Sequence, residues 1–541
     1  MIRWMAWHLH RRGLVGFGIG GFLVSFLYGG AFSSAAGTTP QSQAAFGTAV
    51  SLAGRQFTFL IPLPVHPETL GGYEQYKWLS GAIVMMVIWA ALAGVGAGRG
   101  DEERGLTDGW LASGVSRSRL ILARSAAFGL VLLAACLAAV VGMIAVAPAI
   151  NQDPNVAGSI LKALSMAAGV FACYAIALLI AQIPAERQTA TALGVGAVVL
   201  LLIVNGVADT VGAVSWIGVI SPFHWMERTT SAAPGGTFDL AGTVGLAAAA
   251  LILVAGAIPL FNRRDIGSGL IAGARRSAAP VREASRNPLL RLPFSEGLWE
   301  QRVGLTVWVA STLVLGAVML SVTKSVADAF LADPGLAALF QRASQGEIHA
   351  SLLGLLWFGV ALLLLAGYAV VQVSRWSAQD REGRVELLLS APISRSRVVV
   401  ERALEFAVAS LLIVIGGYLG LAAKAPTSGL HLDAGHVFSA SFLLWPFALA
   451  FGGLGVAVAS RWPRIAVPFL ATFAAVEYFL GDLAPVFKFP DWVANLSVFH
   501  LYGNPVVGAF SLTPAILMTL VFAAGFAAAL ALMRGRDLSS V

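Results

Sequence analysis

The sequence predicts an all-α polytopic membrane protein, and three features of its composition support this fold class. Apolar residues make up 57% of the 541 residues, charged residues make up only 12%, and the mean hydropathy is +0.79. This charged fraction is about half that of a soluble domain. So much apolar surface excludes both a soluble enzyme and a disordered chain. Because lipid offers the backbone no hydrogen bonds, the spans are expected to be helices.

Twelve apolar stretches have the length of about 20 residues that a membrane helix needs. The first half of the chain contains six, near 14–32, 79–98, 126–147, 159–181, 189–208 and 240–261. The second half contains six, near 303–322, 351–373, 405–423, 436–459, 465–483 and 513–533. The first stretch follows two arginines, as a signal peptide would. It is long for one and eleven more spans follow, which favours an uncleaved helix.

The distribution of basic residues predicts the orientation. With the N-terminus inside, the inner segments hold 27 of the 35 Lys and Arg residues and the outer segments hold 8. This ratio favours two cytoplasmic termini. Residues 2–12, ahead of the first span, carry Ile2, Met5, Ala6 and Leu9 on one helical face. That pattern predicts a short helix in the inner interface, with a frayed basic tail as the alternative.

The chain repeats itself at a spacing near 278 residues. Residues 103–124 match residues 381–402, including the shared Ser-Arg-Ser-Arg at 116–119 and 394–397. Six spans therefore occur twice, as two parallel six-helix repeats about an axis along the membrane normal. We expect residues 1–261 and 303–541 to form the two repeats. Residues 262–302, with eight arginines and three prolines, are expected to form a basic cytoplasmic connector.

The inner loop 374–404 has the pattern of a docking element. Leu388 and its apolar neighbours lie at helical spacing after two acidic residues, and Pro392 ends the helix before a basic turn. A short amphipathic helix with acid at one end and arginine at the other suits a groove on a partner protein. The alternative is an interfacial helix that only joins two spans.

These residues resemble the signature loop of permease subunits of type-2 ABC exporters, in the motif E-x-G-x-x-x-L-L-L-S-x-P-I-S-R. The second copy matches closely at Glu382, Gly383, Glu386, Leu388, Pro392, Ser394 and Arg395. The first copy retains Gly105, Asp108, Leu111, Ser116 and Arg117, with Gly114 in place of the proline. The fused twelve-span form resembles bacterial permeases that export polyketide-type antibiotics.

The resemblance implies that both inner loops are coupling helices docked on two copies of an ATP-binding subunit. ATP and Mg would then bind that partner, and this chain would bind no cofactor. The sequence agrees, because it contains no Gly-Lys pair and hence no G-x-x-x-x-G-K-[ST] phosphate loop. The net charge of +7 does not indicate a nucleic-acid partner, since basic residues belong in inner loops. The two cysteines cannot build a metal site or a disulfide framework.

Ionisable and polar residues inside spans are candidates for the path of a hydrophobic small-molecule substrate. Glu477 is the foremost, with Phe473 on the same helical face, and Asn205 is a rough counterpart of Asp482. Met86, Trp89 and Phe358 are predicted to add an adaptable apolar wall. Plain packing, or contact with headgroup water, is the alternative for each. The resemblance implies that segments 209–239 and 484–512, with His224 and His500, cap the outer end of the path.

Three functions remain open from the sequence. The first is the permease of an ATP-driven exporter of hydrophobic or amphipathic molecules, which is a transporter subunit and not an enzyme. The second is an ion- or proton-coupled secondary transporter, which predicts several buried acids and broken helices. The third is a membrane assembly protein without a transport path.

Overall fold

The computed structural model describes residues 1–54, 62–210, 212–270, 295–332, 347–381, 383–390, 392–430, 432–484, 487–507 and 512–536. In these ranges the chain is helical and contains no strand. Twelve helices among the described residues are long and apolar enough to cross a membrane, and each contains or closely matches one predicted span. The predicted fold class is therefore confirmed.

The chain divides into two compact units, Met1–Pro280 and Val281–Val541. The spanning helices of unit 1 are α1 (Ile2–Gly13) with η1 (Leu14–Ile19) and α2 (Gly20–Ala36), α5 (Ser80–Val95) with its flanking turns, α8 (Arg117–Val146), α9 (Val156–Ile180), α10 (Arg187–Thr210) and α12 (Leu240–Arg263). Shorter elements join them: α3 (Pro40–Gly54), α4 (Leu70–Glu74), η3 (Gln75–Leu79), η4 (Gly96–Gly100), α6 (Asp101–Glu103), α7 (Leu106–Ala112), η5 (Ala147–Ile150), η6 (Gly212–Ile220) and α11 (Pro222–Glu227).

The spanning helices of unit 2 are α14 (Arg302–Ala332), α16 (Ile348–Leu353) with η8 (Gly354–Phe358) and α17 (Gly359–Arg381), α19 (Arg395–Ser428), α20 (Ala434–Arg461), α21 (Pro463–Leu483) and α24 (Leu512–Arg534). The shorter elements are α13 (Ser295–Glu300), α18 (Arg384–Ser390), α22 (Asp491–Ala494) and α23 (Val498–Tyr502).

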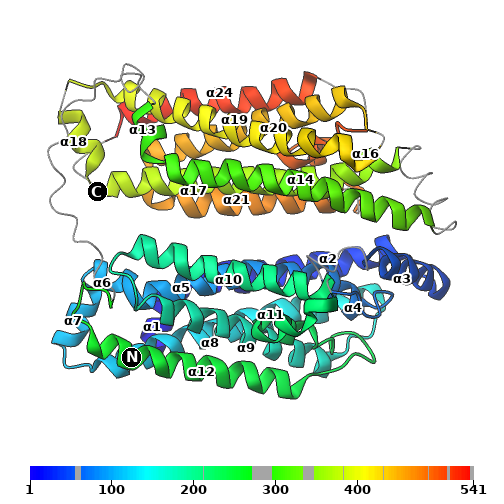
Figure 1. Cartoon of the computed structure of the whole chain (residues 1–541), viewed down its shortest axis with the longest axis horizontal. Coiled ribbons are helices and arrows are strands. Elements are labelled where there is room, and N and C mark those ends of the chain that lie inside the picture. The colour runs from blue at the N-terminus through cyan, green and yellow to red at the C-terminus, as the bar shows by residue number, and fades with distance from the viewer. Residues whose placement is uncertain are drawn as a thin grey trace. The chain divides into compact units, whose positions relative to one another are not determined.

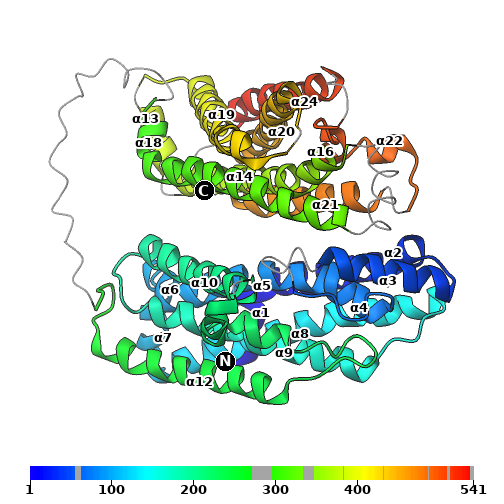
Figure 2. The same cartoon turned by 45° about the vertical axis from the view of Figure 1, so that its right-hand side comes forward.

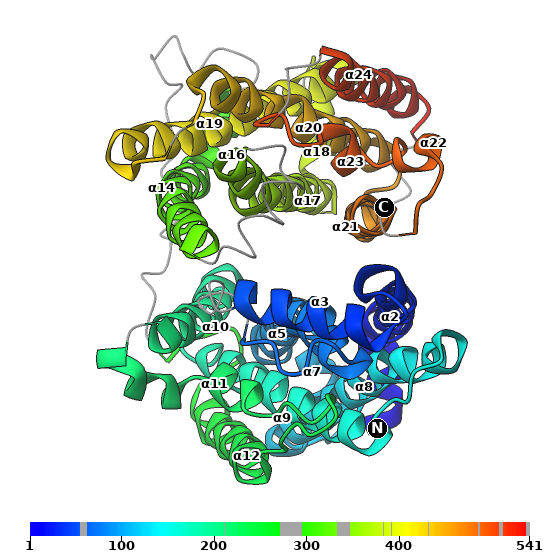
Figure 3. The same cartoon turned by 90° about the vertical axis from the view of Figure 1, so that its right-hand side faces the viewer.

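Within each unit the long helices run side by side along one direction (Figure 1). In unit 1, α7 lies at one end of the bundle and α3 and α4 lie at the other, and the turned view agrees (Figure 2). In unit 2, α18 lies at one end and α22 at the other (Figure 2). The end-on view places α3, α11 and α23 at the ends of the bundles that face the viewer (Figure 3). Each unit therefore has different short helices at its two ends.

Small residues let helices approach closely in unit 2, where lipid supplies little hydrophobic driving force. A Cβ on Gly525 of α24 would lie 2.5 Å from the carbonyl carbon of Gly453 on α20. A Cβ on Gly420 of α19 would lie 2.0 Å from the carbonyl oxygen of Leu313 on α14. These backbones are in contact, so a larger residue at either glycine would separate the helices.

The N-terminal segment differs from the predicted interface helix. Gly13 has helical torsions (φ −67°, ψ −42°), so α1 continues through the π-helical turn η1 into α2, and the first span runs over Ile2–Ala36. The predicted apolar face exists, but it packs on α8 rather than on lipid. Met5 is fully buried there against Leu120, Ala123 and Ala127. No proline separates the two segments, and the glycines between them keep helical torsions.

Candidate functional site

The site begins with two short helices that have the same local structure. Each has seven residues, α7 in unit 1 and α18 in unit 2, and each follows a glycine in the left-handed region. Gly105 has φ +68° and Gly383 has φ +72°, and a Cβ at either position would meet no atom within 4 Å. Glycine is therefore needed at these positions because of the left-handed backbone conformation, and not because a side chain would clash.

The Ser-Arg pair after each short helix begins the next span. The Oγ atoms of Ser116 and Ser394 accept hydrogen bonds from the backbone N–H groups of Arg119 (3.3 Å) and Arg397 (3.2 Å), as N-caps of α8 and α19. The two serines thus fix the points at which these spans start.

The arginine after each serine binds the end of the last span of its unit. Arg117 Nη1 donates to the carbonyl oxygens of Phe261 (3.0 Å), Asn262 (3.3 Å) and Arg264 (2.7 Å) at the end of α12. Arg395 Nη1 donates to those of Met533 (3.2 Å), Arg534 (2.9 Å) and Arg536 (2.8 Å) at the end of α24. A cation is favourable at these unpaired C-terminal carbonyls.

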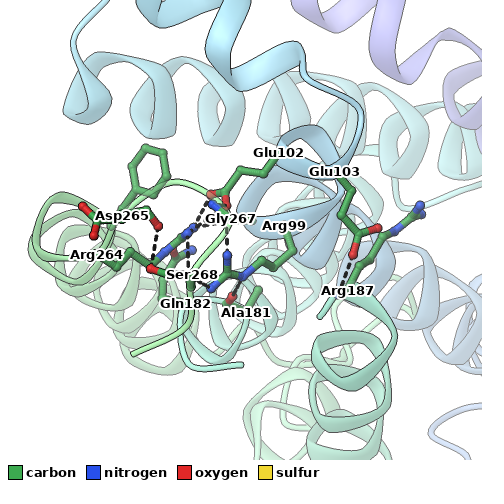
Figure 4. A network of polar contacts seen from close by, with 12 residues as sticks. Arg99, Glu102, Glu103, Ala181, Gln182, Arg187, Arg264, Asp265, Gly267 and Ser268 are labelled. Carbon is green, nitrogen blue, oxygen red and sulfur yellow. Dashed lines mark hydrogen bonds and ion pairs between the residues drawn. The ribbon is translucent and has the colours of Figure 1, made fainter. Parts of the chain in front are cut away.

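A buried ion-pair network joins η4 and α6, which precede α7, to the residues that follow α9 and α12 (Figure 4). Glu102 Oε2 accepts from Arg99 Nη1 at 2.9 Å and from Arg264 Nη1 at 2.8 Å, and Glu102 Oε1 pairs with Arg264 Nη2. Gln182 Oε1 accepts from Arg264 Nε at 3.1 Å. The Arg99, Arg264 and Glu102 side chains are at most 4% exposed. Separately, Arg124 of α8 pairs with Asp101 at 2.7 Å.

One carboxylate makes the corresponding contacts in unit 2. Asp380, at the end of α17, accepts from Arg402 of α19 through Oδ1 and from Arg536 through Oδ2, each at 2.6 Å. Its side chain is 0% exposed. Asp380 therefore joins α17, α19 and the residues that follow α24 directly behind α18.

The two short helices present different surfaces. Val385 anchors α18 in the core of unit 2, whereas Leu387 is 76% exposed and Leu388 is 45% exposed. At the equivalent stretch of α7, Trp110 is half-buried and meets Trp4 of α1 edge-on at 5.5 Å between ring centroids. The apolar surface of α18 is therefore open, while that of α7 is partly covered by α1.

The structure brings the predicted docking residues together at one end of each unit. Asp108, Glu386 and Pro392 are exposed there, and Leu111 is half-buried. Glu382 lies outside the described residues. Sequence reasoning left Asp380, Glu102 and their arginine partners out of the site. A signal for the arginines was present, since Arg124 matches Arg402 and Arg264 matches Arg536 in the aligned copies.

The predicted path residues lie in two groups, one in each unit. In unit 1, Met86 is buried and accepts the Cys136 thiol at 3.8 Å, and Trp89 stacks on Phe17 at 4.6 Å. In unit 2, Phe358 and Phe473 are linked through a continuous set of aromatic contacts. The rings between them belong to Tyr502, Phe447 and Phe451.

The two polar path candidates both contact a short helix at the end of the unit opposite to α7 or α18. Glu477 Oε2 accepts from the backbone N–H of Val498 at 2.7 Å, at the start of α23. Asn205 Nδ2 donates to Asp209 and to Glu227 of α11. Their place on a substrate path stays a prediction, and each has a structural contact in addition.

The fold, with the short helices α7 and α18 each at one end of a bundle, is that of a multi-pass helical membrane protein. A family model described as "Multidrug efflux system permease Rv1217c, C-terminal domain" matches residues 67–261 and 290–534, well over half of the chain. The chain therefore belongs to this family of multidrug efflux permeases. That assignment indicates a transporter subunit rather than an enzyme. No curated protein matches the chain.

Proposed function

We propose that this chain is the membrane-spanning permease of an ATP-driven exporter that docks two copies of a separate ATPase subunit through α7 and α18. The family supports efflux, and the observation that supports docking is the exposed pair Leu387 and Leu388 on α18. An exposed apolar pair on a short amphipathic helix suits a groove on a partner. In this proposal ATP and Mg bind the partner, and the α7 and α18 ends face the cytoplasm, as do both termini.

The buried ion pairs next to α18 would let this helix transmit movement to the membrane-spanning helices. Asp380, shortly before α18 in the chain, pairs with Arg402 and Arg536, and all three residues are buried. Force applied by a partner on Leu387 and Leu388 would therefore reach α17, α19 and α24 together rather than bending a loose loop. Closure of the ATPase dimer would shift these spans from an inward-open to an outward-open arrangement.

We further propose that the two units are parallel repeats of one six-helix design. Four features occur in both at a spacing near 275 residues: the left-handed glycine before the short helix, the serine cap, the arginine on the final carbonyls, and a serine at the opposite end. In the last case Ser221 Oγ donates to the carbonyl of Leu201, and Ser497 Oγ donates to that of Glu477.

The substrates in this proposal are hydrophobic or amphipathic small molecules, with polyketide-type antibiotics as one class to test. The series of aromatic contacts that links Phe358 to Phe473, together with Met86 and Trp89, supports an apolar path in the bacterial plasma membrane. Methionine packs against many ligand shapes because its side chain is flexible and polarizable.

The test of docking is co-purification of the ATPase subunit with tagged permease. Leu388→Asp places a charge in the apolar contact and should reduce ATPase recovery at least tenfold. Leu388→Met keeps volume and polarity and should leave recovery unchanged. Leu111→Asp on α7 should have the smaller effect, because that surface is already partly covered. Full recovery with both aspartate variants would refute docking through these helices, and equal losses would refute the asymmetry.

A further inference from the structure

A polar cluster lies at the end of unit 1 opposite to α7, where α10 meets α11. Asn205 Nδ2 lies 2.8 Å from Asp209 Oδ2, 3.0 Å from Glu227 Oε1 and 3.1 Å from Glu227 Oε2. Asn205 is 3% exposed. One amide group therefore contacts three oxygens of two carboxyl groups, although it has only two N–H bonds to donate.

The neighbouring charges do not compensate two carboxylates. Lys162 of α9 is 4% exposed, and its Nζ donates to the carbonyl oxygens of Met226 (3.2 Å) and Thr229 (2.7 Å) at the end of α11. Arg228 pairs with Asp239, the cap of α12, at 3.2 Å. With both acids ionised, Asp209, Glu227 and Lys162 would leave one negative charge uncompensated. Two adjacent carboxylates rarely both ionise when a proton can be shared.

We propose that Asp209 and Glu227 form a proton-binding site in which the two carboxyl groups share one proton between α10 and α11. With that proton the cluster of Asp209, Glu227 and Lys162 is neutral. Asp209 is exposed, so the proton exchanges directly with solvent at this end of the unit. The site ties α11 to α10, and loss of the proton places two like charges across that contact. This inference does not depend on ATP coupling.

The local electrostatics agree with this geometry. Burial, together with the neighbouring Asp209 charge, raises the pKa of the Glu227 carboxyl to about 8, despite the hydrogen bond from Asn205. A carboxyl with a raised pKa in the folded state binds more protons folded than unfolded between about pH 4.5 and pH 8. The folded state is therefore less stable as pH rises through that window. The remaining titratable group of α11 is His224, whose ring lies edge-on to Trp225 at 5.4 Å.

At the aligned positions unit 2 has neither acid, because Pro485 and Gly503 stand where unit 1 has Asp209 and Glu227. There Ser497 Oγ donates to the Glu477 carbonyl, as Ser221 Oγ donates to the Leu201 carbonyl in unit 1. The Glu477 carboxylate accepts one backbone N–H, from Val498 at 2.7 Å. Glu477 therefore aligns with Leu201 and with neither acid of the pair. The proposal therefore concerns unit 1 alone.

The test follows the thermal unfolding of the purified full-length chain in lipid nanodiscs from pH 5 to pH 9. In the wild type, Tm should show a step, falling by a few degrees between about pH 5 and pH 8 and levelling off above pH 8. Glu227→Gln keeps the shape and removes the titration, so this step should disappear, and Asp209→Asn should move the upper end of the step at least one pH unit lower. Asp153→Asn, an exposed acid at the same end, and His224→Gln are matched controls that should keep the step.

A second readout keeps the proposal falsifiable if a variant folds poorly. The infrared difference spectrum between pH 6 and pH 9 should show loss of a protonated carboxyl C=O band in the wild type and in Asp153→Asn. That band should be missing in Glu227→Gln. A wild-type spectrum without the band, or a Tm step that survives Glu227→Gln, would overturn the proposal. A step that disappears only in His224→Gln would assign the titration to the imidazole and would also overturn it.

Discussion

Arg402 donates a hydrogen bond to Asp380 at 2.6 Å, and the two side chains are 7% and 0% exposed. The same carboxylate holds Arg536 through its other oxygen. The helices α17 and α19 and the residues that follow α24 therefore meet at one aspartate next to α18. In unit 1 two acids divide these contacts, with Asp101 holding Arg124 and Glu102 holding Arg264.

Replacing Asp380 should destabilise unit 2 strongly. Asp380→Asn leaves two buried guanidinium groups without their counter-ion, and breaking a buried pair in this way costs about 3–5 kcal/mol. The measurement is the unfolding midpoint of the detergent-solubilised chain in increasing denaturant. As a control, Glu401→Gln removes an exposed pair with Arg397, for which about 0–1 kcal/mol is expected. Similar losses in the two variants would argue against a central role for Asp380.

Replacing Gly383 should disorder α18 without affecting the rest of unit 2. Its φ of +72° is unfavourable for alanine by about 1–2 kcal/mol, and no neighbouring atom contributes to this cost. Hydrogen exchange of residues 384–390 should therefore become faster in Gly383→Ala. Gly304→Ala, in open space on helix α14, should leave the exchange unchanged. Unaltered exchange in Gly383→Ala would show that the turn tolerates a side chain.

Glu477 should tolerate glutamine better than leucine. A glutamine oxygen can still accept the Val498 N–H, whereas Glu477→Leu leaves that buried donor unpaired at a cost of about 1–3 kcal/mol. Thermal unfolding of the two variants measures this difference. If Glu477 also lies on the substrate path, Glu477→Gln should lower substrate-stimulated ATP turnover of the assembled complex and spare basal turnover. A wild-type stimulated rate across several hydrophobic substrates would remove Glu477 from the path.

The purified chain alone should neither bind nor hydrolyse ATP, because its sequence contains no Gly-Lys pair from which a phosphate loop could be built. The measurement is phosphate release from clean permease in nanodiscs with Mg and ATP, beside the same preparation after addition of the ATPase subunit. Turnover by the isolated permease would contradict the proposed division of labour.

The sequence by itself determined the spans and the turns of this protein. A membrane helix is specified by a local run of about 20 apolar residues, so all twelve spans could be predicted without knowing any contact. The left-handed turns before α7 and α18 are similarly local, since glycine at 105 and 383 is the residue that such a turn favours. The aligned arginines were also visible as a repeated pattern.

Only the tertiary structure decided which groups meet. Asp380 and Arg536 are 156 residues apart in sequence, and Asn205 and Glu227 belong to different helices, so no local pattern specifies either contact. The apolar face of α1 was visible in the sequence. What covers that face was not, because lipid and the side of helix α8 are equally apolar partners. Hydrophobicity fixes that a face must be covered, whereas the packing of the helices fixes what covers it.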